Sequence, residues 1–86
     1  MDADLQEMEL DRKVIELISE ASGVGSDMIR PESSLTDELG LESLDMVELA
    51  LAVEDAFEIE ISDDELDSFQ TTDDVIDHVR TSRLSA

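Results

Sequence analysis

The sequence predicts an all-α protein, a four-helix bundle with a short third helix and a long loop between helices 1 and 2. Apolar residues recur at helical spacing in three longer segments, which is the pattern of amphipathic helices. Only 3 Gly and 1 Pro interrupt the 86 residues, and no pair of alternating segments indicates a β-hairpin. A chain of this length forms one small domain. We therefore expect a single domain over residues 1–86, with flexible ends at 1–6 and 82–86.

The first helix is expected over residues 7–21. Its apolar residues fall on one helical face, and they are Leu10, Val14, Leu17, Ile18 and Ala21. The run Ser-Gly-Val-Gly-Ser at 22–26 follows, and glycine favours the left-handed turn that commonly ends a helix. The sequence thus places the end of this helix just before Gly23.

The long loop is expected over residues 26–42. Pro31 cannot sit inside a helix. Ser34 and Asp37 have the spacing of a helix start, so a short turn is expected there. Gly40 gives the backbone freedom just before the next element. The apolar residues expected to pin this loop to the core are Met28, Ile29, Leu35, Leu39 and Leu41.

The second helix is expected over residues 43–57. Ser43 is a favoured N-cap residue, and Asp45 in the first turn suits the helix dipole. The apolar residues expected to face inward are Leu44, Val47, Ala50, Leu51 and Val53. The acidic residues expected to face outward are Glu42, Asp45, Glu48, Glu54 and Asp55.

Two shorter elements complete the predicted bundle. Ser62 and Glu65 have the spacing of a capping box, which predicts a short third helix. The run Thr-Asp-Asp at 72–74 is expected to cap a final helix. Arg80 and Arg83 near the C-terminus of that helix are expected to complement its dipole. The apolar residues of the two helices are Leu66, Val75, Ile76 and Val79.

The charge of the chain limits its partners. There are 25 Asp and Glu against 5 Lys and Arg, a formal net charge of -20, and residues 31–79 contain no Lys or Arg. Nucleic acids and anionic membranes attract basic surfaces, so both are excluded as partners. Proteins with basic patches are the expected partners, because opposite charge speeds their encounter.

Nothing in the sequence indicates secretion or membrane insertion. The N-terminus is acidic and lacks an apolar run, and the longest apolar stretch, residues 49–53, is too short to span a bilayer. There is no Cys, so neither a disulfide nor a thiolate metal site can reinforce the core. We interpret the chain as a soluble, cytoplasmic monomer.

The sequence lacks the residue sets that enzymes use. It has no Cys nucleophile, no nucleophile-elbow motif and no glycine-rich phosphate loop. His78 is the only His, and we expect a surface or partly packed side chain rather than a catalytic one. The acidic run at 63–67 lacks the Gly and the ligand spacing of an EF-hand. We therefore expect no enzyme activity and no dedicated metal site, only loose binding of divalent cations to acidic faces.

Ser43 is the remaining candidate for chemistry. Taken alone, it would be an ordinary helix cap. Gly40, however, lets the chain turn tightly, so the Ser43 hydroxyl would be presented at an exposed helix start with Leu44 anchoring the helix below it. The free N–H groups of that start could bind a phosphodiester. No base is evident beside Ser43, so we expect an acceptor that another enzyme modifies.

Residues 39–45, Leu-Gly-Leu-Glu-Ser-Leu-Asp, resemble the Leu-Gly-x-Asp-Ser-Leu-Asp pattern of the acyl carrier proteins of fatty-acid and polyketide synthesis. The resemblance covers about residues 7–79 and includes the segments 54–57 and 59–64. It implies that a phosphopantetheinyl transferase moves 4′-phosphopantetheine from coenzyme A to Ser43. The thiol of that arm would then hold acyl groups as thioesters.

The resemblance also implies two further sites. The acyl chain would be sheltered in the core, in a pocket lined by Val47, Leu51, Val53, Ile61, Phe69 and Val75. The transferase and the acyl-loading, synthase and acyltransferase enzymes would use basic patches to meet an acidic docking face. That docking face comprises Glu42, Asp45, Glu48, Glu54, Asp55 and Glu60.

Glu42 departs from the family pattern, which has Asp directly before the Ser. Its longer side chain hints at a specialised carrier of a lipid or polyketide pathway with its own synthase. Two alternatives stay open. One is a carrier of aminoacyl or peptidyl groups, and the other is an acidic docking module that is never modified. The strong acidity and the Leu-Asp pair after Ser43 favour the acyl carrier.

Overall fold

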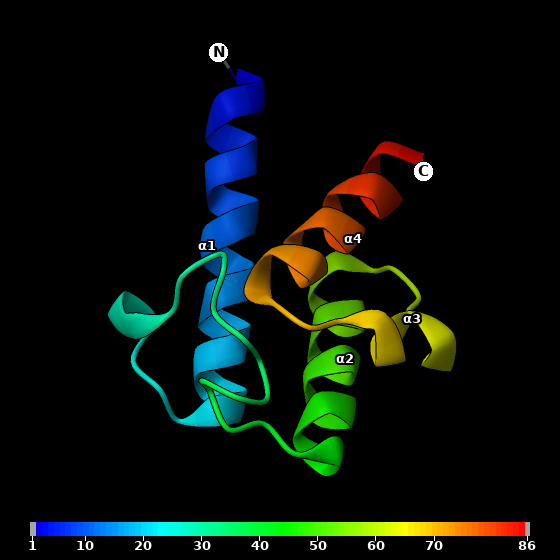
Figure 1. The fold of residues 1–86 in the computed structure, drawn as a ribbon. Helices are drawn as coiled ribbons and strands as arrows, with labels where there is room; N and C mark the ends of the chain where they lie inside the picture. Colours follow the sequence, from blue (N-terminus) through cyan, green and yellow to red (C-terminus); the bar gives the residue numbers. More distant parts are fainter. Residues whose placement is uncertain (1, 86) are drawn as a thin grey trace.

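The computed structural model describes the backbone of residues 2–85 and the side chains of residues 9–82. Its helices are α1 (Asp2–Ser22), the short 3-10 helix η1 (Ser26–Met28), α2 (Ser43–Phe57), α3 (Asp63–Ser68) and α4 (Thr72–Ser85). α1 packs against both α2 and α4, and α3 packs against α2 (Figure 1). Within the described backbone there is no strand, only an isolated bridge between Ser34 and Thr71. The predicted all-α four-helix bundle is confirmed.

α1 is longer than predicted, because it begins at Asp2 rather than at residue 7. Residues 2–6 contain no Gly or Pro that would stop a helix from extending. The end of the helix agrees with the prediction. Gly23 takes φ +78, in the left-handed region that favours glycine, and its N–H donates to Ser19 O at 2.8 Å.

The flexibility expected at residues 1–6 and 82–86 stays a prediction. Residues 1 and 86, together with the side chains of 1–8 and 83–86, lie outside the described part of the chain. The dipole role expected of Arg83 falls on one of these side chains and stays a prediction as well.

The loop between α1 and α2 packs into the core. Its apolar residues are buried as expected at Ile29, Leu35, Leu39 and Leu41. Met28 is the exception: its side chain is 68% exposed, so the prediction that it pins the loop is wrong. It lies in η1, a single turn with no buried residue. The helices, together with Phe69 at the end of α3, supply the rest of the core: Leu10, Val14, Leu17, Ile18, Met46, Leu49, Val53, Phe69, Val75, Ile76 and Val79.

A tight turn directs the loop into α2. Ser34 Oγ accepts a hydrogen bond from the Asp37 N–H at 3.1 Å, and Ser34 O accepts one from the Leu39 N–H at 3.0 Å. Gly40 follows with φ +73, which a residue with a Cβ adopts only at a cost. The turn predicted from Ser34 and Asp37 and the freedom assigned to Gly40 are both confirmed.

α4 is capped one position earlier than predicted. Thr71 N–H donates to Asp74 Oδ2 at 3.1 Å, and Asp74 N–H donates to Thr71 Oγ1 at 3.3 Å. This reciprocal pair satisfies two backbone donors at the helix start. Thr72 is fully buried, and its N–H donates to Ser33 O at 3.1 Å. Thr72, the residue predicted to be the cap, thus joins α4 to the long loop through this hydrogen bond.

The capping box of α3 and the side chain of Arg80 both lie within the described residues. Glu65 N–H donates to Ser62 Oγ at 3.1 Å and Ser62 N–H donates to Glu65 Oε1 at 2.9 Å, so the capping box of α3 is confirmed. The dipole role expected of Arg80 stays a prediction, but its side chain forms two ion pairs. Its guanidinium lies 3.2 Å from Asp11 Oδ1 and 3.5 Å from Asp77 Oδ1, so it links α4 to α1.

Candidate functional site

α2 begins at Ser43 but is capped by the residue before it. Glu42 is the N-cap residue, with backbone angles of φ -98 and ψ 176, and its N–H donates to Asp45 Oδ2 at 3.0 Å. The first helical hydrogen bond runs from the Met46 N–H to Glu42 O at 2.9 Å. The prediction that Ser43 is the cap is therefore wrong by one position.

In this arrangement the Ser43 hydroxyl does not take part in capping the helix. The residue is exposed, and no side chain or backbone group of the described residues forms a hydrogen bond with its Oγ. α1 and α2 begin at opposite ends of the bundle, and α2 begins at the bottom of the view in Figure 1. Ser43 can accept a group there, but it lacks the base partner that a catalytic serine needs.

The position also suits a phosphodiester. The first N–H groups of a helix have no intrahelical acceptor, and the helix dipole favours negative charge at that end. A phosphopantetheine arm joined to Ser43 Oγ would place its phosphate beside these N–H groups. The exposed hydroxyl leaves room for the arm without any displacement of the core.

α2 has two apolar faces, and only one of them is buried. The residues that pack into the core are Met46, Leu49, Ala50 and Val53. Leu44, Val47 and Leu51 are 68%, 45% and 60% exposed, so the prediction that they face inward is wrong, as is the anchoring role given to Leu44. Their spacing of i, i+3 and i+7 places them on one face of the helix. We call these three residues the outer stripe.

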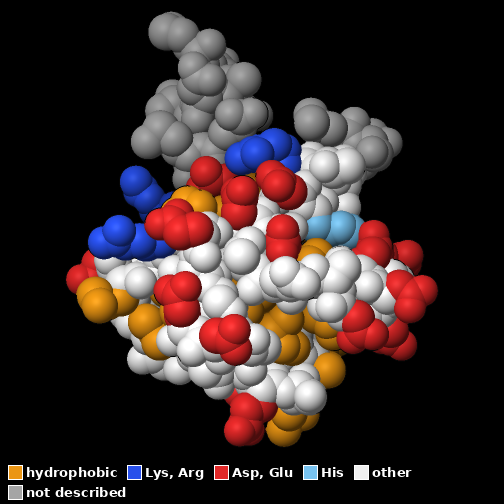
Figure 2. Space-filling view, viewed as in Figure 1, with side chains coloured by type: hydrophobic (Ala, Val, Ile, Leu, Met, Phe, Trp, Pro, Cys, Tyr) orange, Lys and Arg blue, Asp and Glu red, His pale blue; other side chains and the backbone are white. Residues whose placement is uncertain are grey.

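The six acidic residues of the predicted docking face divide into two groups. The exposed ones are Glu42, Glu48, Asp55 and Glu60. Asp45 and Glu54 are half-buried, and each holds a backbone N–H: Asp45 that of Glu42, and Glu54 Oε2 that of Ile61 at 2.8 Å. Figure 2 shows apolar and acidic side chains next to one another on the surface over α2. The outer stripe thus lies within an acidic surround.

The six residues of the predicted acyl pocket differ in burial. Val53, Phe69 and Val75 are buried in the core, and Ile61 is half-buried against it. Val47 and Leu51 belong to the outer stripe, so their assignment to the pocket is wrong. A close-packed core leaves no room for an acyl chain until its side chains part.

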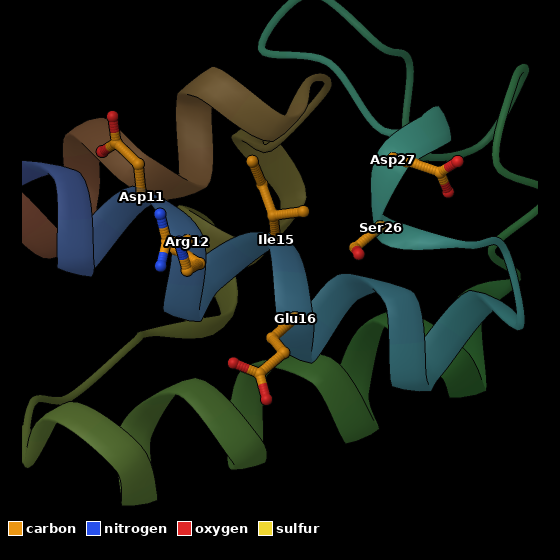
Figure 3. Close-up of a pocket in the computed structure, with 6 residues that line it drawn as sticks. All are labelled: Asp11, Arg12, Ile15, Glu16, Ser26 and Asp27. Carbon is orange, nitrogen blue, oxygen red and sulfur yellow. The ribbon is translucent and has the colours of Figure 1, made fainter.

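A hollow lies elsewhere on the molecule. It has a volume of about 600 Å³ and is lined by residues of α1 and η1 (Figure 3), namely Asp11, Arg12, Ile15, Glu16, Ser26 and Asp27. None of these residues belongs to the predicted pocket or docking face. A smaller hollow of about 330 Å³ lies beside His78 and includes one predicted pocket residue, Phe69.

His78 is partly packed, as predicted. Its Nδ1 lies 3.5 Å from Glu65 Oε2 and its Nε2 lies 3.4 Å from Glu60 O. The ring meets Phe69 edge-on, with the ring centroids 5.5 Å apart. The pKa of Glu65 is lowered, first by its hydrogen bond with the Ser62 backbone, then by the Ser62 side chain, with a smaller contribution from the charge of His78. Sequence reasoning missed these contacts, because they join residues far apart in the chain.

Two further properties concern the described residues only. They contain no group of three or more His, Cys, Asp or Glu side chains arranged to hold a metal ion. None of their helices combines the length and the apolar character needed to cross a membrane.

Comparison with known proteins identifies the family. A model of the family described as "Phosphopantetheine attachment site" matches residues 12–79, which is most of the chain and includes Ser43. The chain belongs to this phosphopantetheine-attachment family. The group that the family carries is therefore phosphopantetheine, and the exposed hydroxyl at the start of α2 fits it.

Individual relatives of this phosphopantetheine-attachment domain are acyl carrier proteins. The one from Chlorobium phaeovibrioides is 45% identical over 47 residues, which cover 55% of this chain and 60% of the relative. The one from Syntrophobacter fumaroxidans is 42% identical over 41 residues, covering 48% and 51%. The matched segment thus spans about 60% or less of the length of these relatives.

A solved structure extends the similarity to the whole fold. The acyl carrier protein of Thermotoga maritima aligns with a TM-score of 0.78 and 29% identity over 92% of each chain. The resemblance to the acyl carrier protein family noted in the sequence is confirmed. Proteins of that name are carriers rather than enzymes, in agreement with the absence of a predicted active site.

Proposed function

We propose that this chain is an acyl carrier protein that holds acyl intermediates as thioesters on a 4′-phosphopantetheine arm attached to Ser43. The observation that carries the proposal is the exposed Ser43 hydroxyl, which has no hydrogen-bond partner among the described residues and stands at the start of α2. The family match and the similar fold support the same conclusion.

The attachment is a phosphoryl-group transfer from coenzyme A. A bond forms between Ser43 Oγ and the phosphorus that bears the pantetheine, the pyrophosphate bond of coenzyme A breaks, and adenosine 3′,5′-bisphosphate leaves. Since no base among the described side chains contacts Ser43, the hydroxyl proton would pass to the phosphopantetheinyl transferase. The arm then supplies the reactive thiol that this Cys-free chain lacks.

Partner enzymes would dock on the outer face of α2. An apolar stripe within an acidic surround suits a partner whose basic patch encloses a small apolar depression. Glu42, Glu48 and Asp55 supply exposed charge, while Leu44, Val47 and Leu51 supply the apolar contact. We assign this face to the transferase and to the acyl-loading, synthase and acyltransferase enzymes. The carrier would serve these enzymes as a cytoplasmic monomer.

The acyl chain would lie in the apolar interior next to Val53, Phe69 and Val75, with Ile61 at its edge. These side chains form a core with few aromatic residues, since the chain has 2 Phe and no Trp or Tyr. The pathway would be fatty-acid synthesis or a specialised lipid or polyketide pathway, and Glu42 in place of the usual Asp favours a specialised carrier.

The experiment is incubation of the full chain with coenzyme A, Mg²⁺ and a promiscuous transferase, followed by intact mass measurement. We expect the mass to rise by one phosphopantetheine in the wild type and in Ser26→Ala, which removes another exposed hydroxyl. We expect no gain in Ser43→Ala. A wild type that stays unmodified while folded would favour the unmodified docking module. Loading with acyl and aminoacyl donors then separates an acyl carrier from an aminoacyl carrier.

A further inference from the structure

α3 is held in place by few contacts. It comprises only Asp63–Ser68, and none of its residues is buried. An isolated helix of this length is not stable in water, so its position depends on its neighbours. Its one large apolar residue, Leu66, is half-buried against the core. The side chains that contact α3 therefore determine how often the helix detaches from the bundle.

His78 of α4 contacts residues 60–69 at three points. Its Nε2 faces Glu60 O at 3.4 Å before the helix, and its Nδ1 faces Glu65 Oε2 at 3.5 Å within it. Its ring packs against Phe69, which follows the helix and is itself buried. One side chain thus contacts the entry, the middle and the exit of residues 60–69.

Both ring nitrogens of His78 face an oxygen acceptor. A neutral imidazole carries a single N–H, so one of its nitrogens would present a lone pair to an oxygen. The imidazolium carries two N–H groups and can donate to Glu60 O and to Glu65 together. The geometry therefore matches the protonated ring better than the neutral one.

The charged groups around the ring also suit the protonated form. The carboxylate of Glu65 in α3 faces the His78 ring, and so does the backbone carbonyl of Glu60 in the loop before α3. Asp74 and Asp77 of α4 line the hollow beside the ring. Arg80, the cation of α4 among the described side chains, is paired with Asp11 and Asp77. The lowered pKa of Glu65 keeps that carboxylate ionised wherever a histidine titrates.

We propose that His78 is a proton-operated clasp, which holds residues 60–69 against α4 when its ring is protonated and loosens them when the ring is neutral. The imidazolium has two N–H groups for Glu60 O and Glu65, whereas the neutral ring has one. The stabilisation of α3 is therefore present at acidic pH and is lost as the pH rises. The proposal concerns the bundle alone and does not depend on modification of Ser43.

The test measures amide hydrogen exchange of the full, unmodified chain by NMR at pH 5.5 and pH 8.0, corrected for the intrinsic exchange rate. The probes are the N–H of Leu66, which donates to Ser62 O, and that of Phe69, which donates to Leu66 O. The N–H of Met46 in α2 serves as the reference. We expect the protection of the two probes to fall about threefold at the higher pH, the effect of one exposed ion pair.

Three variants assign the effect. His78→Gln removes the charge, and Glu65→Gln removes the charge of the partner while keeping an acceptor for the capping box. Both should abolish the pH dependence. Glu60→Gln removes a nearby charge but leaves the carbonyl that faces the ring, so it should behave like the wild type. Equal protection at both pH values in the wild type, or an unchanged pH dependence in both His78→Gln and Glu65→Gln, would overturn the proposal.

Discussion

The N–H of Glu42 donates a hydrogen bond to Asp45 Oδ2 at 3.0 Å, and this pair closes the start of α2 on either side of Ser43. The residues that stabilise the helix start are therefore not the residue that would be modified. A serine that served as the cap would have its hydroxyl occupied by a backbone N–H. Here the hydroxyl stays free for a transferase, and its neighbours keep the helix start ordered.

Exchange of Asp45 for Ala should destabilise the protein, whereas Ser43→Ala should not. Loss of a reciprocal cap typically costs about 1 kcal/mol, which lowers the Tm of a domain of this size by roughly 4–8 °C. Removal of an exposed hydroxyl without a partner should change stability by less than about 0.5 kcal/mol. Thermal unfolding followed by circular dichroism measures both. A larger loss for Ser43→Ala than for Asp45→Ala would restore Ser43 as the cap.

Leu49 and Leu51 should differ sharply in their contribution to stability, although they are two residues apart in one helix. Leu49 is 2% exposed and Leu51 is 60% exposed. Leu49→Ala leaves a cavity in the core and should cost about 2–5 kcal/mol, whereas Leu51→Ala should cost about 0.5 kcal/mol or less. Urea unfolding of the two variants provides the comparison. Similar losses for both would mean that the outer stripe is packed inside.

Replacement of Glu58 by Gly should stabilise the protein. Glu58 ends α2 with φ +55, in the left-handed region where a residue with a Cβ is disfavoured by about 1–2 kcal/mol. Since glycine loses more entropy on folding, we expect a net gain of about 0.5–1 kcal/mol in urea unfolding. The matched control, Glu60→Gly, removes the same charge at a residue without positive φ and should destabilise. A loss of stability in Glu58→Gly would refute this expectation.

The capping box of α3 should weaken in acid. The folded state lowers the pKa of Glu65, chiefly through the Ser62 backbone hydrogen bond. A carboxyl with a lowered pKa contributes stability above its unfolded pKa, about 4.3 for Glu, and this contribution is lost as the pH falls through the folded pKa. We expect the NMR titration of the Glu65 side chain to have a lower midpoint in the wild type than in Ser62→Ala. Because the backbone N–H remains in Ser62→Ala, identical midpoints would contradict the contribution of the Ser62 side chain, the second cause.

Much of the fold was readable from the sequence, because its local signals agree with its tertiary packing. α2 begins and ends where the sequence predicts, since its start follows Gly40 and its helical pattern ends at Phe57. The Ser62 capping box and the Ser34 turn were also predictable, because each depends on residues three apart. η1 was missed because a single turn is too short to show helical periodicity.

The orientation of α2 could not be read from the sequence. Its apolar residues form two interleaved sets at helical spacing, and an amphipathic pattern does not say which set is buried. Met46 and Leu49 pack inside, and Leu44 and Leu51 stay outside. An apolar residue at nearly every turn of both faces was the signal that could have revealed a second surface.

Contacts between distant residues were also out of reach. The Arg80–Asp11 ion pair joins residues 69 positions apart, and the contact of His78 with Glu60 O spans 18. Neither contact has a local pattern, so only the charge of Arg80 and the uniqueness of His78 were visible in advance. For the same reason the predicted acyl pocket included Val47 and Leu51, which are exposed.

Fragmentation of the intact protein by mass spectrometry after treatment with coenzyme A and a transferase tests attachment at Ser43 most directly. Whole-protein fragmentation is preferable to trypsin, because residues 31–79 contain no Lys or Arg for trypsin to cleave. We predict a single phosphopantetheine located on Ser43, and no modification of a folded Ser43→Ala variant. An arm on any other residue, or a folded wild type that gains no mass, would contradict attachment at Ser43.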